Sequence, residues 1–247
     1  EPAKRRARVD SRCVNNAMMA TLMGAAVSDG LNDGEVVSGV GGQYNFVAQA
    51  FALDGARSIL TLESVRQAGA RTDSNVRWSY GQTTIPRHLR DIVVTEYGVA
   101  DLRGRSDAEV IAAMLQVADS RFQPELMRQA KDAGKLPKGF EIAAAYREND
   151  PQRIEAALKP AREAGLLPMF PFGSDFTPVE QRLIPALQIV SGAAKSPWQL
   201  AGLAWQGMTQ PDAANTAPLA RLGLDKPKTL SDRFYRALVG GALSRTR

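Results

Sequence analysis

The chain has 247 residues, 44% hydrophobic and 23% charged, which is enough to bury a substantial core in one large or two small domains. No apolar run approaches the roughly 20 residues that cross a bilayer, and the single cysteine, Cys13, excludes an intrachain disulfide. The formal net charge of +5 is modest. These features predict a globular cytoplasmic protein without a membrane partner.

Residues 1–12 carry a basic run, Lys4-Arg5-Arg6-Ala7-Arg8. Such a run can bind nucleic acid, but no aromatic residue is interleaved with it and no nucleic-acid-binding fold is indicated. We interpret residues 1–12 as a basic linker or tail and expect no nucleic-acid partner. A basic interaction module led by this segment stays open as an alternative, which steeply salt-dependent binding to duplex DNA would favour.

The first part of the chain predicts a strand, a glycine turn and a helix. Residues 13–27 are rich in Ala and Met and are compatible with helix or strand, and two Asp-Gly pairs predict turns over residues 29–34. A short buried strand is expected at Val36-Val37. A glycine turn follows at residues 38–43, and a helix is expected over residues 44–53.

The middle of the chain alternates strands and helices. In chain order we expect a strand at 58–62, a polar loop over 63–82 with one strand at 76–80, a strand at 92–95, a helix at 107–117 N-capped by Asp107, and a helix at 124–133 that stops at Gly134. This order predicts an α/β domain over residues 13–137, with a mostly parallel sheet covered by helices.

Beyond Pro137, prolines recur and divide the chain into short segments that we expect to form amphipathic helices, the clearest of them at residues 178–190. We therefore interpret residues 138–247 as a C-terminal helical extension packed on the α/β domain.

The glycine turn reads Ser-Gly-Val-Gly-Gly-Gln over residues 38–43. Glycines let backbone N–H groups approach and converge on one oxygen or phosphate. The turn is not a known nucleotide loop, because a dinucleotide fingerprint from Gly39 needs glycine where Tyr44 stands. A P-loop from Gly34 needs Lys and Ser or Thr where Val40-Gly41 stands. A purely structural tight turn stays open as the alternative.

A second motif covers residues 93–104 and places Glu96 directly after the apolar strand at 92–95. The carboxyl end of a buried strand is where open α/β sheets place ligands. The alternative is that Glu96 pairs with Arg103 or Arg87 and only holds the loop.

The two motifs together resemble one family. Residues 38–46, Ser-Gly-Val-Gly-Gly-Gln-Tyr-Asn-Phe, are similar to the SGVGGQxDF stretch of the acetyl-CoA hydrolase/transferase family. Residues 93–104 are nearly identical to its VVTEYGVADLRG motif, and the resemblance extends over about residues 14–130. It implies a class I-type CoA transferase built from two related α/β domains. This chain resembles the C-terminal one, so we expect the N-terminal domain of a longer protein as partner and a possible homodimer.

The resemblance also implies the chemistry, which needs coenzyme A as a substrate and no metal. A glutamate attacks the acyl-CoA thioester, and an acyl-glutamyl anhydride and then a glutamyl-CoA thioester form. A second carboxylate, or water, then releases the enzyme. No glutamate of this chain stands in the family's nucleophile context. We therefore expect that residue upstream, and we expect this chain alone to lack acyl transfer.

The resemblance assigns active-site roles to residues of both motifs. Gly42 or Gly41 would supply an N–H to the oxyanion, Asn15 would hydrogen-bond the reacting carboxylate, and Glu96 would orient or gate the nucleophile. The residues expected to contact coenzyme A are Ser38, Gly39, Val40, Gln43 and Arg57, with Arg87 and Arg103 as further candidates for its phosphates.

Two positions depart from the family. Asn45 stands where the family usually has Asp, and Glu63 replaces a common Pro. Because these departures change the surroundings of the turn and of the loop, a non-catalytic CoA-binding or regulatory domain of the same fold stays open.

Overall fold

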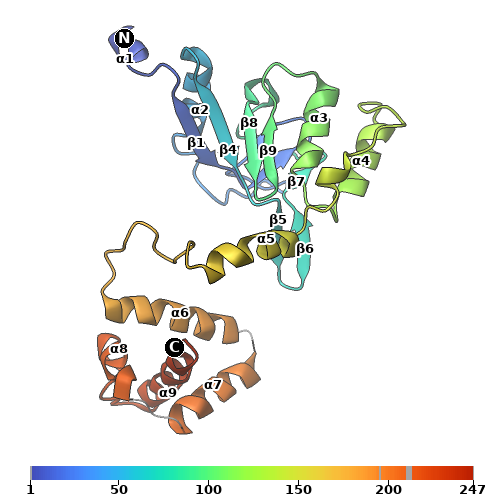
Figure 1. The fold of residues 1–247 in the computed structure, drawn as a ribbon. Helices are drawn as coiled ribbons and strands as arrows, with labels where there is room; N and C mark the ends of the chain where they lie inside the picture. Colours follow the sequence, from blue (N-terminus) through green and yellow to red (C-terminus); the bar gives the residue numbers. More distant parts are fainter. Residues whose placement is uncertain (1, 195, 210–212, 247) are drawn as a thin grey trace. The chain divides into compact units, whose positions relative to one another are not determined.

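The computed structural model describes residues 2–194, 196–209 and 213–246, and its contacts divide the chain into two compact units, residues 1–166 and 167–247 (Figure 1). The boundary expected from the sequence, between residues 137 and 138, stays a prediction. None of the helices in the described part of the chain has the length and apolar character needed to span a bilayer.

The first unit combines helices with strands that form a four-stranded main sheet and two smaller sheets. Its strands are β1 (Arg12–Asn16), β2 (Met19–Thr21), β3 (Ala26–Val27), β4 (Arg57–Thr61), β5 (Val65–Ala68), β6 (Arg71–Ser74), β7 (Val76–Arg77), β8 (Ile92–Thr95) and β9 (Gly98–Asp101). Its helices are α1 (Pro2–Arg6), α2 (Gln43–Ala52), α3 (Asp107–Gln116), α4 (Gln123–Asp132) and α5 (Pro151–Glu163), with 3-10 turns at Arg87–Leu89 and Ala144–Tyr146.

The main sheet has the order β1-β4-β8-β9, in which β1, β4 and β8 run parallel and β9 runs antiparallel to β8. The pairing register places Asn15, Leu60 and Val93 on one face. The apolar sides of α2 and α3 cover this face, because Leu60 clusters with Val47 of α2, and Val93 clusters with residues of α3. The predicted α/β fold with a mostly parallel, helix-covered sheet is confirmed.

Several local predictions are confirmed within a residue or two, namely the helices α2, α3 and α4 and the strands β4 and β8. The helix α4 ends as expected, with Gly134 in the left-handed region at φ +66°. Ser106 and not Asp107 caps α3, however. Its side chain accepts a hydrogen bond from the Glu109 N–H, and the Glu109 side chain in return accepts from the Ser106 N–H.

Two strand predictions were wrong. Val36 and Val37 form no buried strand, because they are 73% and 45% exposed, and Val36 makes only an isolated bridge to Gly30. The segment over residues 63–82 is not mainly loop either, since β5 and β6 pair as an antiparallel hairpin. Gly69, at φ +64°, provides the left-handed residue that this tight turn requires, which allows polar strands to pair.

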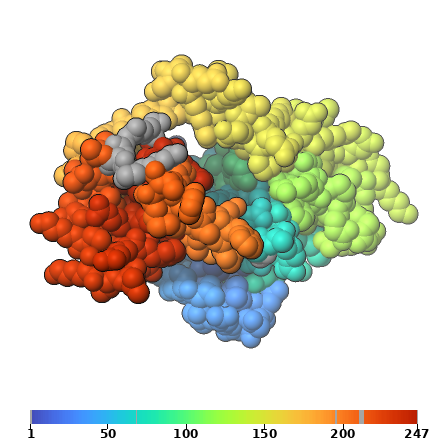
Figure 2. Space-filling view, turned by 90° about the horizontal axis from the view of Figure 1, so that it is seen from below, coloured from blue at the N-terminus to red at the C-terminus, as the bar shows by residue number. Residues whose placement is uncertain are grey.

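The second unit is helical, with α6 (Pro178–Ala193), α7 (Pro197–Thr209), a 3-10 turn at Ala213–Asn215, α8 (Thr216–Arg221) and α9 (Leu230–Ser244). Buried residues of α6, α7, α8 and α9 form one apolar cluster, and the space-filling view shows the residues of this unit, coloured orange to red, gathered together (Figure 2). A Cβ at Gly207 would lie 1.8 Å from the Ala237 carbonyl oxygen, and one at Gly241 would lie 2.0 Å from that of Leu203. These two glycines therefore let the backbones of α7 and α9 touch.

Candidate active site

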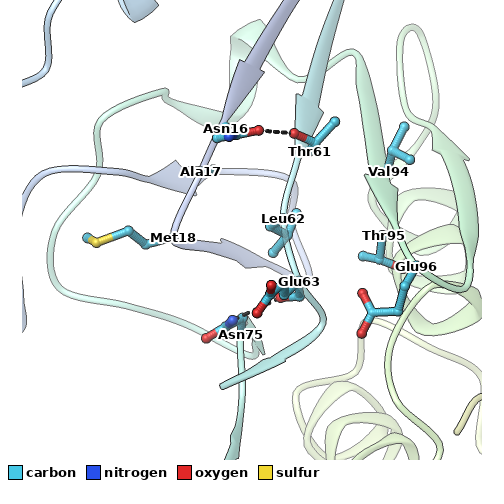
Figure 3. Close-up of a pocket in the computed structure, with 10 residues that line it drawn as sticks. All are labelled: Asn16, Ala17, Met18, Thr61, Leu62, Glu63, Asn75, Val94, Thr95 and Glu96. Carbon is cyan, nitrogen blue, oxygen red and sulfur yellow. Dashed lines mark hydrogen bonds between the residues drawn. The ribbon is translucent and has the colours of Figure 1, made fainter. Parts of the chain in front are cut away.

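A pocket of about 470 Å³ opens at the carboxyl edge of the main sheet, where β1, β4 and β8 end (Figure 3). Polar residues follow the end of each strand, because a chain that leaves a buried sheet at one edge meets solvent there. The lining residues are Asn16, Ala17, Met18, Thr61, Leu62, Glu63, Asn75, Val94, Thr95 and Glu96. Of the residues predicted for the site, only Glu96 is among them.

Ser64 holds the carboxylate of Glu96 by both of its oxygens. The Ser64 N–H donates to Oε2 at 2.8 Å, and the Ser64 hydroxyl donates to Oε1 at 2.6 Å. Ser64 is fully buried, while Glu96 is exposed. The carboxylate therefore has a fixed orientation at the rim of the pocket, whereas neither Arg103 nor Arg87 pairs with it, as the structural alternative would require.

The turn between β8 and β9, which carries Glu96, is anchored to the chain after α3. The Thr95 hydroxyl donates to the Val117 carbonyl at 2.7 Å, and the Tyr97 hydroxyl donates to the buried carboxylate of Asp119 at 2.9 Å. Arg121 binds the same carboxylate with two nitrogens, at 2.8 Å each. This network holds the Glu96 turn against the chain that follows α3.

The network shifts the pKa values of its members. Burial, together with the hydrogen bond to Asp119, raises the pKa of Tyr97 well above its ordinary value. Burial works to raise the pKa of Asp119, but the hydrogen bonds from Arg121 and Tyr97 outweigh it and lower that pKa. Tyr97 is thus kept neutral as a donor, and Asp119 is kept ionised as an acceptor.

A second carboxylate, Glu63, follows the end of β4 and also lines the pocket. Within the described ranges its side chain forms no hydrogen bond or ion pair, whereas its backbone carbonyl accepts from the Asn75 amide at 2.8 Å. Across the pocket, the Thr61 hydroxyl hydrogen-bonds the side-chain oxygen of Asn16 (Figure 3). The pocket thus presents carboxylates on one side and an amide–hydroxyl pair on the other.

Asn15 and Asn16 point to opposite faces of β1, since successive side chains of a strand alternate. Asn16 faces the pocket, whereas the side-chain nitrogen of Asn15 is buried and has no hydrogen-bond partner within the described residues. A buried unpaired donor costs about 1–3 kcal/mol. The side-chain amide of Asn15 is therefore a donor that the described residues leave unsatisfied.

The glycine turn lies beside the end of β1 and leads into α2. Gly41 has φ +56°, Gly42 is the residue before the first turn of α2, and Ser38, Gly39 and Val40 are exposed. In the part of the chain that the structure describes, the N–H groups of residues 39–42 donate to no acceptor. Free N–H groups at the N-terminus of a helix form a site for an anionic oxygen.

Gln43 connects the glycine turn to the pocket. Its side-chain nitrogen donates to the Asn16 carbonyl at 2.9 Å, and its side chain is buried. The same residue thus fixes the beginning of α2 against the end of β1. This contact brings the free N–H groups of the turn to the rim that Asn16 forms.

Arg57, in contrast, begins β4 at the opposite edge of the sheet. Its guanidinium binds Asp91, with Nε at 2.8 Å from Oδ1, and also binds Asp101. The hydrogen bond to Asp91 is the main cause that raises the pKa of Arg57. The structure therefore does not bring Arg57 together with Glu96 and the glycine turn.

Ser64 and Asn16 are the site residues that the sequence analysis missed. The signal for Ser64 was its position two residues past the expected strand at 58–62, the place where open sheets present polar groups. Asn16 needed the strand register, because the sequence does not say which of two adjacent asparagines faces the pocket. Among the described residues, no group of three or more His, Cys, Asp or Glu side chains is arranged to hold a metal ion.

The family model of the acetyl-CoA hydrolase/transferase C-terminal domain matches residues 1–130, which is more than half of the chain. The chain belongs to this family. The resemblance that the two motifs indicated is therefore confirmed.

Curated relatives are CoA-transferases. The 4-hydroxybutyrate coenzyme A transferase of Clostridium kluyveri is 31% identical over 119 residues, which are 48% of this chain and 28% of that protein. The butyryl-CoA:acetate CoA-transferase of Anaerostipes caccae is 29% identical over 126 residues, which are 49% of this chain and 28% of that protein. The chain thus matches little more than a quarter of the length of these relatives.

Among solved structures, RipA from Yersinia pestis aligns with 55% of this chain and 30% of its own length, at 29% sequence identity and a TM-score of 0.48.

Proposed function

We propose that this chain forms one wall of the thioester site of a CoA transferase or acyl-CoA hydrolase that acts on a short acyl-CoA. The observation that carries the proposal is the Glu96 carboxylate, fixed by two hydrogen bonds from Ser64 on the wall of a pocket at the carboxyl edge of the sheet. The family membership supports the same chemistry.

The proposed reaction needs a nucleophilic glutamate from outside this chain. Its carboxylate attacks the thioester carbonyl carbon, the C–S bond breaks, and CoA leaves as the thiolate, so that an acyl-glutamyl anhydride remains on the protein. The thiolate then attacks the glutamyl carbonyl, which releases the acyl group as a carboxylate and leaves a glutamyl-CoA thioester. A second carboxylate reverses these steps, or water attacks in its place and releases the free glutamate and CoA.

In this reaction, the glycine turn would stabilise each oxyanion. The free N–H of Gly42 or Gly41 would donate to it, a contact whose loss typically costs about 2.7–4 kcal/mol of transition-state stabilisation. The unpaired amide of Asn15 would hold the nucleophilic carboxylate, and Glu96 would orient it. The exposed segment Ser38–Val40 would border the CoA thiol end, with Gln43 positioning the turn.

Other parts of the proposal concern the whole protein. The N-terminal domain as partner, a homodimer, and a cytoplasmic location stay predictions, as does a contact between Arg57 and coenzyme A.

The proposal is tested by calorimetric titration of the 247-residue chain with coenzyme A, and by a CoA-exchange assay with acetyl-CoA and labelled acetate. We expect the chain to bind coenzyme A and to show exchange only when it is combined with the domain that carries the glutamate. Glu141→Gln, at an exposed glutamate remote in sequence from both motifs, is the matched control for Glu96→Gln.

Glu96→Gln is expected to reduce the exchange rate by at least about tenfold, because an orienting carboxylate is lost. Robust exchange by the chain alone would overturn the expectation that the nucleophile lies elsewhere. Binding of coenzyme A without any turnover in the combined protein would instead favour a non-catalytic CoA-binding domain.

A further inference from the structure

A second cavity, of about 390 Å³, lies at the amino edge of the main sheet, away from Glu96. Four arginines line it, Arg87, Arg90, Arg103 and Arg105, and Asp107 is its only acidic lining residue among those that the structure describes. The chain folds this way because Arg87 and Arg90 precede β8, and Arg103 and Arg105 follow β9, its antiparallel neighbour. The β8–β9 pairing therefore brings both arginine pairs to one edge.

Cations outnumber carboxylates around this cavity. Asp107 accepts from Arg90 at 3.2 Å and from Lys135 at 3.2 Å, and Arg87 lies 3.5 Å away. One carboxylate thus serves three cations. Burial opposes ionisation of Asp107, but the hydrogen bonds from Lys135 and Arg90 outweigh it and lower its pKa, so its single negative charge is fully present at neutral pH.

The other two arginines add to the positive charge. Arg103 shares the buried Asp91 with Arg57, and its Nε–H is buried without a partner within the described ranges. The guanidinium of Arg105 forms no hydrogen bond or ion pair in the described part of the chain. The carboxylate of the nearby Glu109 is held in the capping box with Ser106, and it interacts with Arg105 only through its charge.

We propose that this cavity, defined by Arg87, Arg90, Arg103 and Arg105, binds the phosphate groups of a small phosphorylated molecule at a site separate from the thioester pocket. Guanidinium groups present planar forks of N–H donors that match phosphate oxygens, and several of them around one cavity favour a diphosphate over a single carboxylate. The ring of Phe51, whose centroid lies 4.3 Å from the Arg103 guanidinium carbon, closes one side with an apolar wall.

The two sites lie at opposite ends of the same strands. Arg57 begins β4 and Thr61 ends it, and a five-residue strand spans about 16 Å. Glu96 lines the carboxyl-edge pocket, whereas the four arginines line the amino-edge cavity. Occupation of one site therefore does not require occupation of the other, and this inference does not rest on the proposed thioester chemistry.

The test is calorimetric titration of the full chain with inorganic pyrophosphate, and then with ADP and coenzyme A, at low ionic strength. The double variant Arg87→Gln/Arg105→Gln is expected to bind pyrophosphate at least about tenfold more weakly, because two charge-assisted contacts are lost. Arg105→Gln alone should show a smaller loss in the same direction. It is the safer variant for folding, since its guanidinium has no partner to leave unpaired.

The matched control is Arg153→Gln/Arg162→Gln, which removes the same charge from two exposed arginines of α5. Arg153 and Arg162 are 53% and 54% exposed, compared with 59% for Arg87. We expect this control to bind pyrophosphate within about twofold of the unchanged chain. Glu96→Gln should also leave pyrophosphate binding unchanged.

ADP that binds more tightly than pyrophosphate, with both lost in the double variant, would support a nucleotide as the source of the phosphates. Binding of pyrophosphate alone, lost in the same variant, would support a free phosphate compound. The proposal is overturned if pyrophosphate does not bind at millimolar concentration, or if the control loses as much affinity as the double variant. It is also overturned if coenzyme A displaces pyrophosphate at concentrations at which ADP does not, because the cavity would then be an outer part of the CoA site.

Discussion

The two edges of the main sheet use polar groups in opposite ways. At the amino edge, Asp91 is 1% exposed and binds two arginines and a backbone N–H, so its charge is neutralised inside the fold. At the carboxyl edge, polar groups are left open: in the described ranges the Glu63 carboxylate has no partner, and the N–H groups of residues 39–42 in the glycine turn donate to no acceptor. The buried Asp91 cluster therefore stabilises the sheet at the amino edge, whereas the unpaired groups at the carboxyl edge are available to a ligand.

The largest effect is expected from Asp91→Ala. The Asp91 carboxylate accepts from Arg57 Nε at 2.8 Å, from the Ser58 N–H at 2.7 Å and from Arg103. Its removal leaves Arg103 without a carboxylate partner and Arg57 with only the half-exposed Asp101, which should lower the free energy of unfolding by about 3 kcal/mol. Urea unfolding followed by circular dichroism measures the change.

Asp101→Ala is the control for this comparison, since Asp101 binds the same Arg57 but is 47% exposed. We expect a loss below about 1 kcal/mol, because solvent screens exposed ion pairs. Equal losses in the two variants would contradict the view that burial of Asp91 is what stabilises this edge.

The next effect is the dependence of stability on pH, which should come from the network behind Glu96. Because the pKa of Asp119 is lowered in the folded state, its contribution is fully present above the unfolded value near 4 and is lost as the pH falls through the folded pKa. The raised pKa of Tyr97 affects stability at alkaline pH, where stability is lost as the pH rises above about 10.

Between pH 2 and pH 7, the temperature of thermal unfolding should therefore change more steeply with pH for the unchanged chain than for Asp119→Asn, whose side chain cannot ionise. If the two profiles have the same slope, the Asp119 network does not control acid stability.

A smaller effect on the free energy of unfolding is expected for two buried serines, Ser58 within β4 and Ser64 shortly after its end. Ser64→Ala removes the hydroxyl that donates to Glu96, and we expect a loss of about 1.5 kcal/mol, as for other hydrogen bonds to charged groups. The hydroxyl of Ser58 is buried without a partner within the described residues, so Ser58→Ala should be neutral or stabilising. Opposite signs in urea unfolding would support the comparison, and equal losses would contradict it.

The smallest effect is expected in the glycine turn. Gly41→Ala places a Cβ on a residue with φ +56°, which should cost about 1 kcal/mol, although nothing lies within 4 Å of that Cβ. Gly39→Ala has the same open surroundings and no positive φ, and it should change stability very little. Urea unfolding of the two variants checks whether conformation alone makes glycine necessary at position 41.

Much of the fold followed from local sequence patterns. The apolar runs that form β4 and β8, and the helical spacing of Val110, Ile111 and Met114 in α3, predicted their elements within a residue. The polar hairpin β5–β6 was missed because its pairing depends on a turn and not on an apolar pattern. At Val36-Val37 a strand was predicted where the structure has an exposed loop, because an apolar pair next to a turn is compatible with either.

The sequence by itself determined the family, the glycine turn and the position of Glu96 after a buried strand, because these depend on residues adjacent in the chain. Only the tertiary structure decided that Ser64 holds Glu96, that Asn16 faces the pocket, and that Arg57 lies at the other edge. Each of those facts depends on strand register and on the pairing of distant segments. A register shift of one residue would reverse the faces on which these side chains lie.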